Sequence, residues 1–498
     1  MFRYNSRFVM SLVMSALLLV GIAALRAGEY DEYYTVFLLA GHARPGWPVG
    51  IFSAGAVRAA YHGHAGLVQI AQDLRHGDVH PPLYFWVASF WRAWAGNGLF
   101  PLRLLSVGIS VAGLWGLGKL AQATRVPVAS AILMTVLCYG FAYTAIVARG
   151  FALAQSLNIF GVWLIYEALV RRSGSRALLG GLCLGAASFS NYLACFVGFG
   201  ALFWLFLNGF KQWRLWVLAL LGFAAFMPAD GWFFIAQRSS RAGQFAPFEW
   251  PKALALLARD GGASMFGGLT TYGPWFVHMP VELGLLGMTI GLLILMARQP
   301  QGLFVLCAFA TPIGLLVLGR VFDNLPIEIR YLTFVLPFFG LLAAGALADM
   351  KPLRNAIIAV QIASVIGLAV APATMQKQQI LAQDLAPLAD PSTLILLPFG
   401  NDGVGLPGPF IAASPDRQTI LLVKQNFEPA QLAAMIAPYR LVAVPLILGD
   451  GSSRSAVPAM LGLFKSASCW QAVPTQEGIA AFENHCRGTT LNVISGIH

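Results

Sequence analysis

The sequence predicts a polytopic α-helical membrane protein with about eleven transmembrane helices and a small soluble α/β domain at its C-terminus. Hydrophobic residues make up 58% of the 498 positions and charged residues only 11%, whereas a soluble globular protein is about a quarter charged. Apolar runs long enough to span a bilayer as helices recur along most of the chain. After about residue 375 these runs shorten to the length of strands.

The first apolar run, 8–25, follows Arg3 and Arg7. Arg26 interrupts the small residues that a signal-peptide cleavage site requires, so we expect a retained anchor with a cytoplasmic N-terminus. Ten further runs complete the membrane part: 103–118, 127–147, 151–170, 177–190, 192–210, 215–235, 280–297, 302–319, 331–348 and 355–372.

Residues 81–95 form one more apolar stretch, but about fifteen helical residues reach only roughly 22 Å, less than the hydrocarbon core of about 30 Å. Trp91, Arg92 and Trp94 suit a helix that lies in the interface plane. If this stretch does not span, every basic short loop lies on the cytoplasmic side, as the positive-inside rule requires. These loops contain Lys119, Arg125, Arg171, Arg172, Arg176, Lys211, Arg214, Arg298, Lys351 and Arg354.

This threading divides the chain into a membrane domain, 1–372, and an external domain, 373–498. Two long external loops, 27–102 and 236–279, interrupt the membrane domain, and long loops commonly carry function. In the external domain, strands that alternate with helices predict a small α/β fold. Strands are expected at 393–398, 419–424, 441–448 and 478–482, and helices at 428–439 and 455–465.

The formal net charge of +11 does not indicate a nucleic-acid partner, because many basic residues lie in short loops and form no stripe with aromatic residues. Cys469 and Cys486 are the only cysteines of the external domain and are a candidate disulfide if that domain lies outside the cytoplasm. The sequence has no Cys/His metal spacing and few carboxylates, so neither a metal nor another cofactor is indicated.

Three carboxylates, Glu29, Asp31 and Glu32, lie among tyrosines where the first predicted span leaves the lipid. One interpretation is a solvated, aromatic-rich interface. The other is a general base or a metal ligand whose pKa is tuned by partial burial near the membrane surface.

A second motif reads Asp78-Val79-His80-Pro81-Pro82-Leu83-Tyr84. The two prolines predict a helix start, and an imidazole beside a helix N-terminus adds a donor or a charge for an anion such as a phosphate. The alternative is a helix-start turn with an incidental histidine.

Two arginines mark other ends of predicted spans. Arg149 lies in a short turn between two spans, and Arg330 precedes Tyr331 at the start of a late span. Each could be an interfacial anchor or an anion ligand. The threading places these arginines, the acidic cluster and the His80 motif on one side of the membrane. Such a combination suits a substrate that is half lipid and half phosphate.

With these motifs the sequence resembles the C-type (GT-C) membrane glycosyltransferases, the superfamily of protein O-mannosyltransferases and of lipid A aminoarabinose transferases. The resemblance covers most of residues 1–350 and rests on five features. They are Asp31-Glu32 after the first span, His80-Pro81-Pro82-Leu83-Tyr84 at an in-plane helix, Arg149 in the next outer turn, Arg330-Tyr331, and Pro337 after them.

The resemblance implies a GT-C-like fold, a polyprenyl-phosphate sugar donor and chemistry at the outer face. Asp31 would be the catalytic base, and Glu32 would assist it or hold the acceptor. The lipid A branch has a lysine where His80 stands and an acidic residue in the turn that holds Arg149. The donor phosphate and sugar would be bound by His80, Tyr84, Arg149, Arg330 and Tyr331.

We therefore expect inverting sugar transfer to a lipid, glycan or protein acceptor, in a bacterial inner membrane with the external domain in the periplasm. Three alternatives stay open at this point. They are a transporter or flippase for a lipid-linked substrate, a glycan ligase, polymerase or lipid phosphotransferase, and a non-catalytic scaffold.

Overall fold

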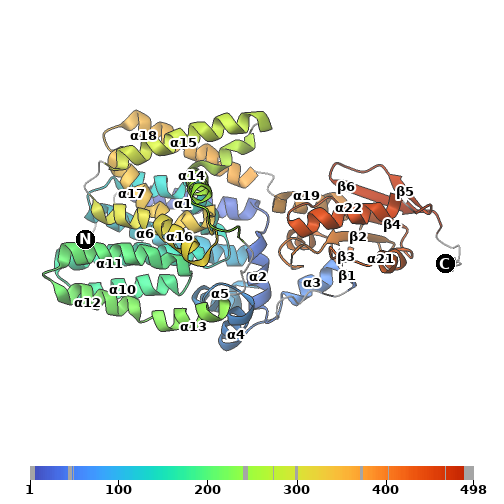
Figure 1. Ribbon diagram of the computed structural model, residues 1–498, viewed down its shortest axis with the longest axis horizontal. Helices are drawn as coiled ribbons and strands as arrows, with labels where there is room; N and C mark the ends of the chain where they lie inside the picture. Colours follow the sequence, from blue (N-terminus) through green and yellow to red (C-terminus); the bar gives the residue numbers. More distant parts are fainter. Residues whose placement is uncertain are drawn as a thin grey trace. The chain divides into compact units, whose positions relative to one another are not determined.

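The computed structural model describes residues 6–42, 48, 50–238, 245–272, 274–297, 301–370, 374–401, 403–465 and 467–486. The chain forms two compact units (Figure 1). The membrane unit contains Met1–Arg26 and Ala65–Ala371, and the tail unit contains Ala27–His64 and Pro372–His498. Residues 27–64, which the sequence analysis placed in an external loop of the membrane domain, thus form one compact unit with the C-terminal tail. Arg298, one of the predicted cytoplasmic residues, lies outside the described residues.

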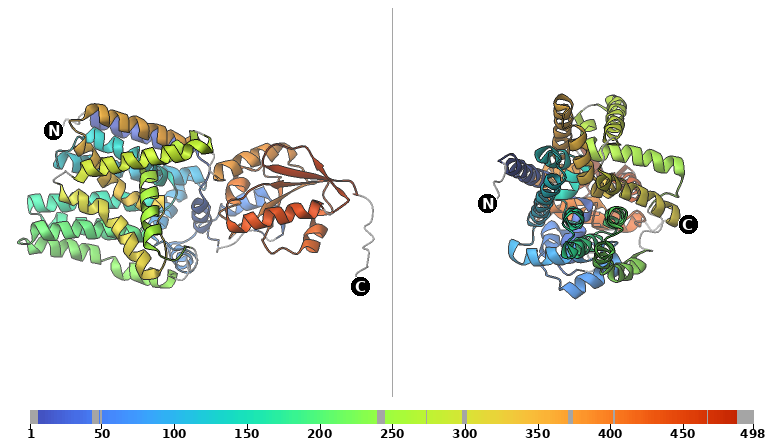
Figure 2. Two further views of the ribbon diagram at one scale, coloured as in Figure 1. Left: turned by 45° about the horizontal axis from the view of Figure 1, so that its top comes forward. Right: turned by 90° about the vertical axis from the view of Figure 1, so that its left-hand side faces the viewer.

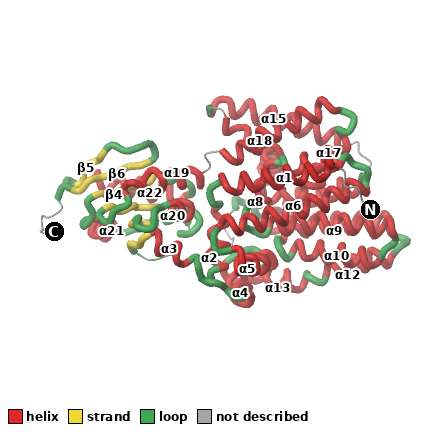
Figure 3. Tube along the Cα trace, turned by 180° about the vertical axis from the view of Figure 1, so that it is seen from behind, coloured by secondary structure: helices red, strands yellow, loops and turns green. Residues whose placement is uncertain are grey.

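The described part of the membrane unit is helical (Figure 3). Its first helices are α1 (Ser6–Leu25), α4 (Leu67–Gly77), α5 (Leu83–Ala95), α6 (Leu99–Ala123), α7 (Val128–Val136), α8 (Tyr139–Ile146), α9 (Phe151–Arg171) and α10 (Gly174–Ser188). They are followed by α11 (Cys195–Gly209), α12 (Trp213–Ala224), α13 (Met227–Gln237), α14 (Trp250–Phe266), α15 (Trp275–Ala297), α16 (Gly302–Phe322), α17 (Leu336–Ala346) and α18 (Lys351–Val370). Short 3-10 helices cover Tyr192–Ala194, Gly267–Tyr272 and Ile329–Val335. Neighbouring helices pack side by side, such as α9 on α10 and α1 on α18 (Figure 2).

Among the described residues, nine helical segments are long and apolar enough to cross a membrane. They are 6–25, 99–123, 151–171, 192–209, 213–237, 276–296, 302–322, 329–346 and 351–370. The bent pair α7–α8 counts as a tenth where it is taken as one broken span, and α10, with 15 residues, corresponds to the short predicted run 177–190. The chain is therefore an integral membrane protein of the predicted class.

The predicted span 127–147 is broken into α7 and α8, whose axes differ by 72°. Cys138 adopts an extended conformation at the break. The Gln361 amide inserts there and donates to the Met134 carbonyl at 3.4 Å. A polar side chain that enters the backbone ladder is a common cause of a kink. The break lets α8 run to the turn that carries Arg149.

Helix α5 has 13 residues and, as expected for an in-plane helix, is too short to cross a bilayer. Phe90 and Trp94 are exposed on it, whereas Arg92 is buried and donates from Nε to Asn97 Oδ1 at 2.9 Å. Burial lowers the pKa of Arg92 to about 10. The guanidinium therefore remains charged at neutral pH and holds the end of the helix.

The tail unit is an α/β fold built on a six-stranded sheet, drawn in yellow in Figure 3. Its helices are α2 (Tyr30–Leu39), α3 (Ala54–Ala60), α19 (Thr374–Leu385), a 3-10 helix Ala386–Leu388, α20 (Gly408–Ala413), α21 (Pro429–Ile436) and α22 (Gly451–Lys465). Its strands are β1 (Ile51–Ser53), β2 (Thr393–Pro398), β3 (Thr419–Val423), β4 (Leu441–Pro445), β5 (Trp470–Val473) and β6 (Ile479–Asn484). The strand order is β1-β3-β2-β4-β6-β5.

The centre of this sheet is parallel and its flanks are antiparallel. Strand β2 pairs in parallel with β3 and β4, and β1, β6 and β5 add antiparallel strands. All residues of β2 and β4 are buried, the pattern of central parallel strands covered on both faces. The predicted α/β tail is confirmed, and the predicted strand 393–398 has the bounds of β2.

Cys469 and Cys486 form a disulfide that joins the start of β5 to the residues after β6. We expect alkylation of the denatured, unreduced protein to modify four cysteines, Cys138, Cys183, Cys195 and Cys307. Reduction should add two further alkyl groups, which intact-mass analysis detects. Six alkylated cysteines before reduction would contradict the disulfide and an oxidising location for the tail.

Candidate active site

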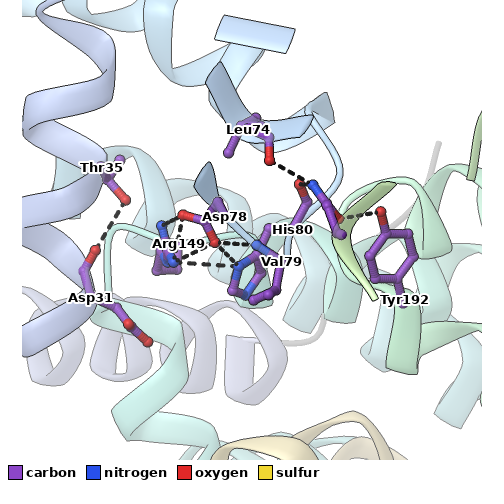
Figure 4. A network of polar contacts seen from close by, with 9 residues as sticks. Asp31, Thr35, Leu74, Asp78, Val79, His80, Arg149 and Tyr192 are labelled. Carbon is purple, nitrogen blue, oxygen red and sulfur yellow. Dashed lines mark hydrogen bonds and ion pairs between the residues drawn. The ribbon is translucent and has the colours of Figure 1, made fainter. Parts of the chain in front are cut away.

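Arg149 is fully buried in the turn between α8 and α9, with 2% of its surface exposed. Helix α8 ends because Val147 is extended, and the Arg149 N–H donates to the Val147 carbonyl at 2.8 Å. The guanidinium points to Asp78, the residue after α4 (Figure 4). Nη1 and Nη2 lie 3.2 Å from Asp78 Oδ2, and Nη2 lies 3.3 Å from Oδ1. A buried arginine and a buried carboxylate thus compensate each other's charge.

His80 completes this cluster, which we call the Arg149 cluster: Asp78, His80 and Arg149. His80 Nδ1 lies 2.9 Å from Asp78 Oδ1 and 3.3 Å from Arg149 Nη2. Because a carboxylate only accepts and a guanidinium only donates, the shorter distance assigns the proton to Nδ1, which donates to Asp78. His80 and Asp78 are 5% and 7% exposed. The cluster is neutral overall when the imidazole is neutral and carries one positive charge when it is protonated.

The segment between α4 and α5 is held by contacts from two other elements of the membrane unit, the end of α10 and α13. The Leu83 N–H, the first of α5, donates to the Phe189 carbonyl at 3.3 Å. Gln237, the last residue of α13, donates to the carbonyls of Leu74 and His80 at 2.8 and 3.1 Å. Its own Oε1 accepts from the Tyr192 hydroxyl at 2.8 Å (Figure 4). Helix α5 begins at Leu83, so the two prolines precede it rather than occupy its first turn.

Tyr84 is fully buried, and its hydroxyl lies 3.0 Å from Ser106 Oγ. Ser106 Oγ in turn donates to the Val147 carbonyl at 2.9 Å. The Tyr84 hydroxyl therefore supports the turn that carries Arg149 through one intermediate side chain.

Replacing Tyr84 by phenylalanine removes that hydroxyl and keeps the packed ring. We expect Y84F to cost about 0.5–1.5 kcal/mol of stability, because a single neutral hydrogen bond contributes this much. The measurement is the shift in the thermal unfolding midpoint of the purified protein in detergent. An unchanged midpoint would show that the bond to Ser106 contributes nothing.

Arg330 and Tyr331 lie in the 3-10 helix Ile329–Val335. Arg330 Nε lies 2.5 Å from Glu328 Oε2, and the guanidinium carbon lies 5.2 Å from the centre of the Tyr331 ring. Arg330 is partly exposed, whereas Tyr331 is buried. Further along this helix, Phe334 stacks on Phe151 at 6.2 Å, and the Phe151 ring lies 6.3 Å from that of His80. Aromatic contacts thus connect the helix of Arg330 to the Arg149 cluster.

The carboxylates predicted as base and acceptor ligand, Asp31 and Glu32, lie in the first turn of α2, in the tail unit. Glu32 is fully buried, and its Oε2 accepts from the Glu29 N–H at 2.7 Å, so it caps its own helix. Asp31 is half-buried, and the Thr35 hydroxyl donates to its backbone carbonyl at 3.4 Å (Figure 4).

A tyrosine lies close to this turn in the tail unit. Burial, and the neighbouring Tyr33, raise the pKa of Tyr61. Its phenol therefore stays protonated at neutral pH. Tyr61 lies in the segment 27–64, and none of the sequence motifs includes it.

Two residues of the membrane site were missed by the motif analysis. Asp78 belongs to the His80 motif, but the sequence assigns it no role, and Gln237 lies in none of the motifs. The signal for Asp78 is an acid two residues before a histidine. No comparable signal exists for Gln237, which approaches from 157 residues away. Among the described residues, no group of three or more His, Cys, Asp or Glu could hold a metal ion.

Known proteins provide two kinds of match. Residues 79–232 match the family model described as dolichyl-phosphate-mannose-protein mannosyltransferase. This range includes His80 and Arg149 but neither Asp31 nor Arg330. No curated protein sequence matches the chain.

Among solved structures, the chain is similar to ArnT from Cupriavidus metallidurans bound to undecaprenyl phosphate, with 14% identity and a TM-score of 0.51 over 99% of this chain and 100% of that one. The apo state of ArnT matches with 13% identity and a TM-score of 0.49 over 95% and 97%. Arabinofuranosyltransferase AftD from Mycobacteria matches with 13% identity and a TM-score of 0.44 over 96% of this chain and 40% of that one. The fold is thus similar to that of ArnT, and the family model supports the predicted resemblance to the C-type membrane glycosyltransferases over residues 79–232.

Proposed function

We propose that this protein is a glycosyltransferase that moves a sugar from a polyprenyl-phosphate donor to an acceptor at the outer face of the membrane. The Arg149 cluster is the observation that carries the proposal. It is a buried cluster of an arginine, its aspartate partner and a histidine at the ends of helices of the membrane unit, and both His80 and Arg149 lie within the residues that match the mannosyltransferase family model. The similar ArnT structure contains undecaprenyl phosphate, and we extend a lipid phosphate of this kind to the present chain.

The donor phosphate would be bound beside His80 and Arg149. Asp78 already compensates the charge of Arg149, so an added phosphate favours the protonated form of His80, which then donates from Nε2. Arg330 would supply a further charge, with Tyr331 beside it. Tyr84 would act from the interior by holding the Arg149 turn. Preorganised donors of this kind stabilise charge that grows on a leaving phosphate.

In the transfer step, the bond between the anomeric carbon and the phosphate oxygen breaks, and its electron pair leaves with the polyprenyl phosphate. The acceptor hydroxyl oxygen forms the new bond to that carbon from the opposite face, so the configuration inverts. The Asp31 carboxylate takes the hydroxyl proton. Glu32 would assist by fixing the first turn of α2, and no redox step or resident cofactor is required.

The proposed location and orientation of the protein follow from the predicted threading and the resemblance. We place the protein in a bacterial inner membrane, with a cytoplasmic N-terminus and a periplasmic tail unit. The acceptor is a lipid, a glycan or a protein, and nucleic acid is not a partner. The net charge of +11 is then a consequence of the cytoplasmic loops.

The experiment offers purified protein a set of lipid-linked sugars that share one polyprenyl chain. A monosaccharide on a single phosphate should be consumed, with release of polyprenyl monophosphate. Consumption of only an oligosaccharide pyrophosphate would identify a glycan ligase or polymerase instead. Movement of the intact donor across a liposome bilayer without sugar transfer would identify a flippase.

A further inference from the structure

The helix that carries Asp31 is built into the tail unit by the segment that follows it. Strand β1 pairs with β3 as the edge strand of the tail sheet, with Phe52 opposite Ile420. Directly after it, the N–H groups of Ala54 and Gly55 donate to the carbonyls of Gln418 and Asp416 at 2.9 and 3.0 Å. Residues 51–53 are therefore a strand of the tail sheet, and the first two residues of α3 continue the hydrogen bonding to the same segment, although more than 300 residues separate the two segments in sequence.

Arg58 on α3 binds the same part of the tail unit, between α20 and β3. Its Nε donates to Asp416 Oδ1 at 2.8 Å, and its Nη1 donates to the carbonyls of Ile411 and Ser414 at 2.9 and 2.5 Å. These carbonyls lie at the C-terminal end of α20. A cation at this end is favourable, because the last carbonyls of a helix have no partners within it.

Helix α2 itself rests on the residues that lead into α20. The ring of Tyr30 covers Gly405. A Cβ atom added at Gly405 would overlap this ring, because its three nearest atoms are all ring carbons of Tyr30. The ring of Tyr33 covers Gly408, where a Cβ atom would lie 2.7 Å from ring carbons. The Ala27 N–H, before α2, donates to Gln376 Oε1 on α19 at 2.8 Å. Tyr30 and Tyr33, which flank Asp31 and Glu32 in the sequence, thus pack against two glycines of the tail unit.

We propose that the tail unit positions the Asp31 carboxylate, with Gly405 and Gly408 as positioning residues for the transfer step. This inference rests on the proposed role of Asp31 as the base. The two glycines act through the tyrosine rings, because only a residue without a side chain admits a ring so close to its backbone.

The physical consequence is geometric. A general base must lie within hydrogen-bond reach of the proton that it takes, and a displacement of about 1 Å can lower a rate by about 10²-fold. A larger side chain at 405 pushes the Tyr30 ring away and shifts the turn that holds Asp31. The Arg149 cluster belongs to the membrane unit, so donor binding should not change.

The test is a double-mutant cycle on Gly405 and Tyr30, with kcat and the KM for the donor as readouts. We expect Gly405→Val to lower kcat by about 10–100-fold at an unchanged donor KM. In a Tyr30→Ala background, the same Gly405→Val change should have no further effect, because the overlapping ring is gone. Gly405→Ala should act in the same direction and replaces Gly405→Val if that variant does not fold. Gly462→Ala, a substitution on α22 with nothing within 4 Å of the new methyl group, is the matched control and should keep the parental kcat.

Three outcomes would contradict the inference. They are a parental kcat for Gly405→Val and Gly405→Ala, a loss that appears in the donor KM instead of kcat, and a loss of the same size in the Tyr30→Ala background. The variant Asp31→Ala, measured in parallel, distinguishes an error in this inference from an error in the proposed function. If Asp31→Ala is inactive and the Gly405 variants are not, the base is correct and the tail does not position it. If Asp31→Ala has the parental rate, the assignment of the base is itself wrong.

Discussion

Replacing Asp31 by alanine is expected to lower kcat by about 10²–10⁴-fold, the range that a general base contributes. The acceptor hydroxyl must lose its proton as the new glycosidic bond forms, and no water-exposed base replaces a carboxylate held at the reacting oxygen. Asp31 lies in the first turn of α2. Because the proposed donor site is in the membrane unit, the affinity for polyprenyl phosphate should stay at the parental value. The measurement is the initial transfer rate at saturating donor, with donor binding measured separately.

Two variants control this prediction. Asp31→Asn keeps the shape of the side chain but not its basicity, so it should lose nearly as much rate as Asp31→Ala. Glu477→Ala removes an exposed carboxylate from the same unit and should leave the rate unchanged. Transfer by Asp31→Ala at the parental rate would remove Asp31 from the mechanism.

The second large effect concerns stability. Removing the carboxylate of Asp78 takes a buried counter-charge from the buried Arg149, and loss of one partner of a buried ion pair typically costs about 3–5 kcal/mol. We therefore expect Asp78→Ala to lower the free energy of unfolding by this amount, and Arg149→Ala to have a similar effect. The double variant should lose less than the sum of the two, because neither charge is then left alone. The free energy of unfolding in detergent, measured for the parent, both single variants and the double variant, gives the coupling energy between Asp78 and Arg149.

The surface pair Glu249–Lys252 is a matched control for this cycle. Its side chains are 53% and 61% exposed, with Lys252 Nζ 2.5 Å from Glu249 Oε1. A solvated pair of this kind contributes less than about 1 kcal/mol, so its cycle should show almost no coupling. Additive losses at Asp78 and Arg149 would mean that the two side chains do not depend on each other.

The membrane fold could be predicted from the sequence because long apolar runs admit few alternatives in lipid. The threading placed His80 and Arg149 on the same side of the membrane, and the resemblance implied that both bind the donor phosphate; in the structure their side-chain nitrogens lie 3.3 Å apart. The break between α7 and α8 could not be predicted, because no proline marks it and its cause, Gln361, lies on α18.

The part that the sequence could not predict is the membership of residues 27–64 in the tail unit. Strand β1 has three residues, and it is a strand only because β3 offers an edge. Strand β5 is similarly short and half exposed. Such elements depend on tertiary pairing rather than on their own residue pattern. The strands β2 and β4, by contrast, were visible as continuous apolar runs between turn residues.

The most direct test of the proposed reaction is a balance of products from a donor that carries one labelled sugar on one polyprenyl phosphate. Purified protein with its acceptor should release one polyprenyl monophosphate for each sugar transferred, and the Asp31→Ala protein should release almost none in the same time. Release of pyrophosphate, sugar transfer without release of the lipid phosphate, or equal release by both proteins would contradict the mechanism.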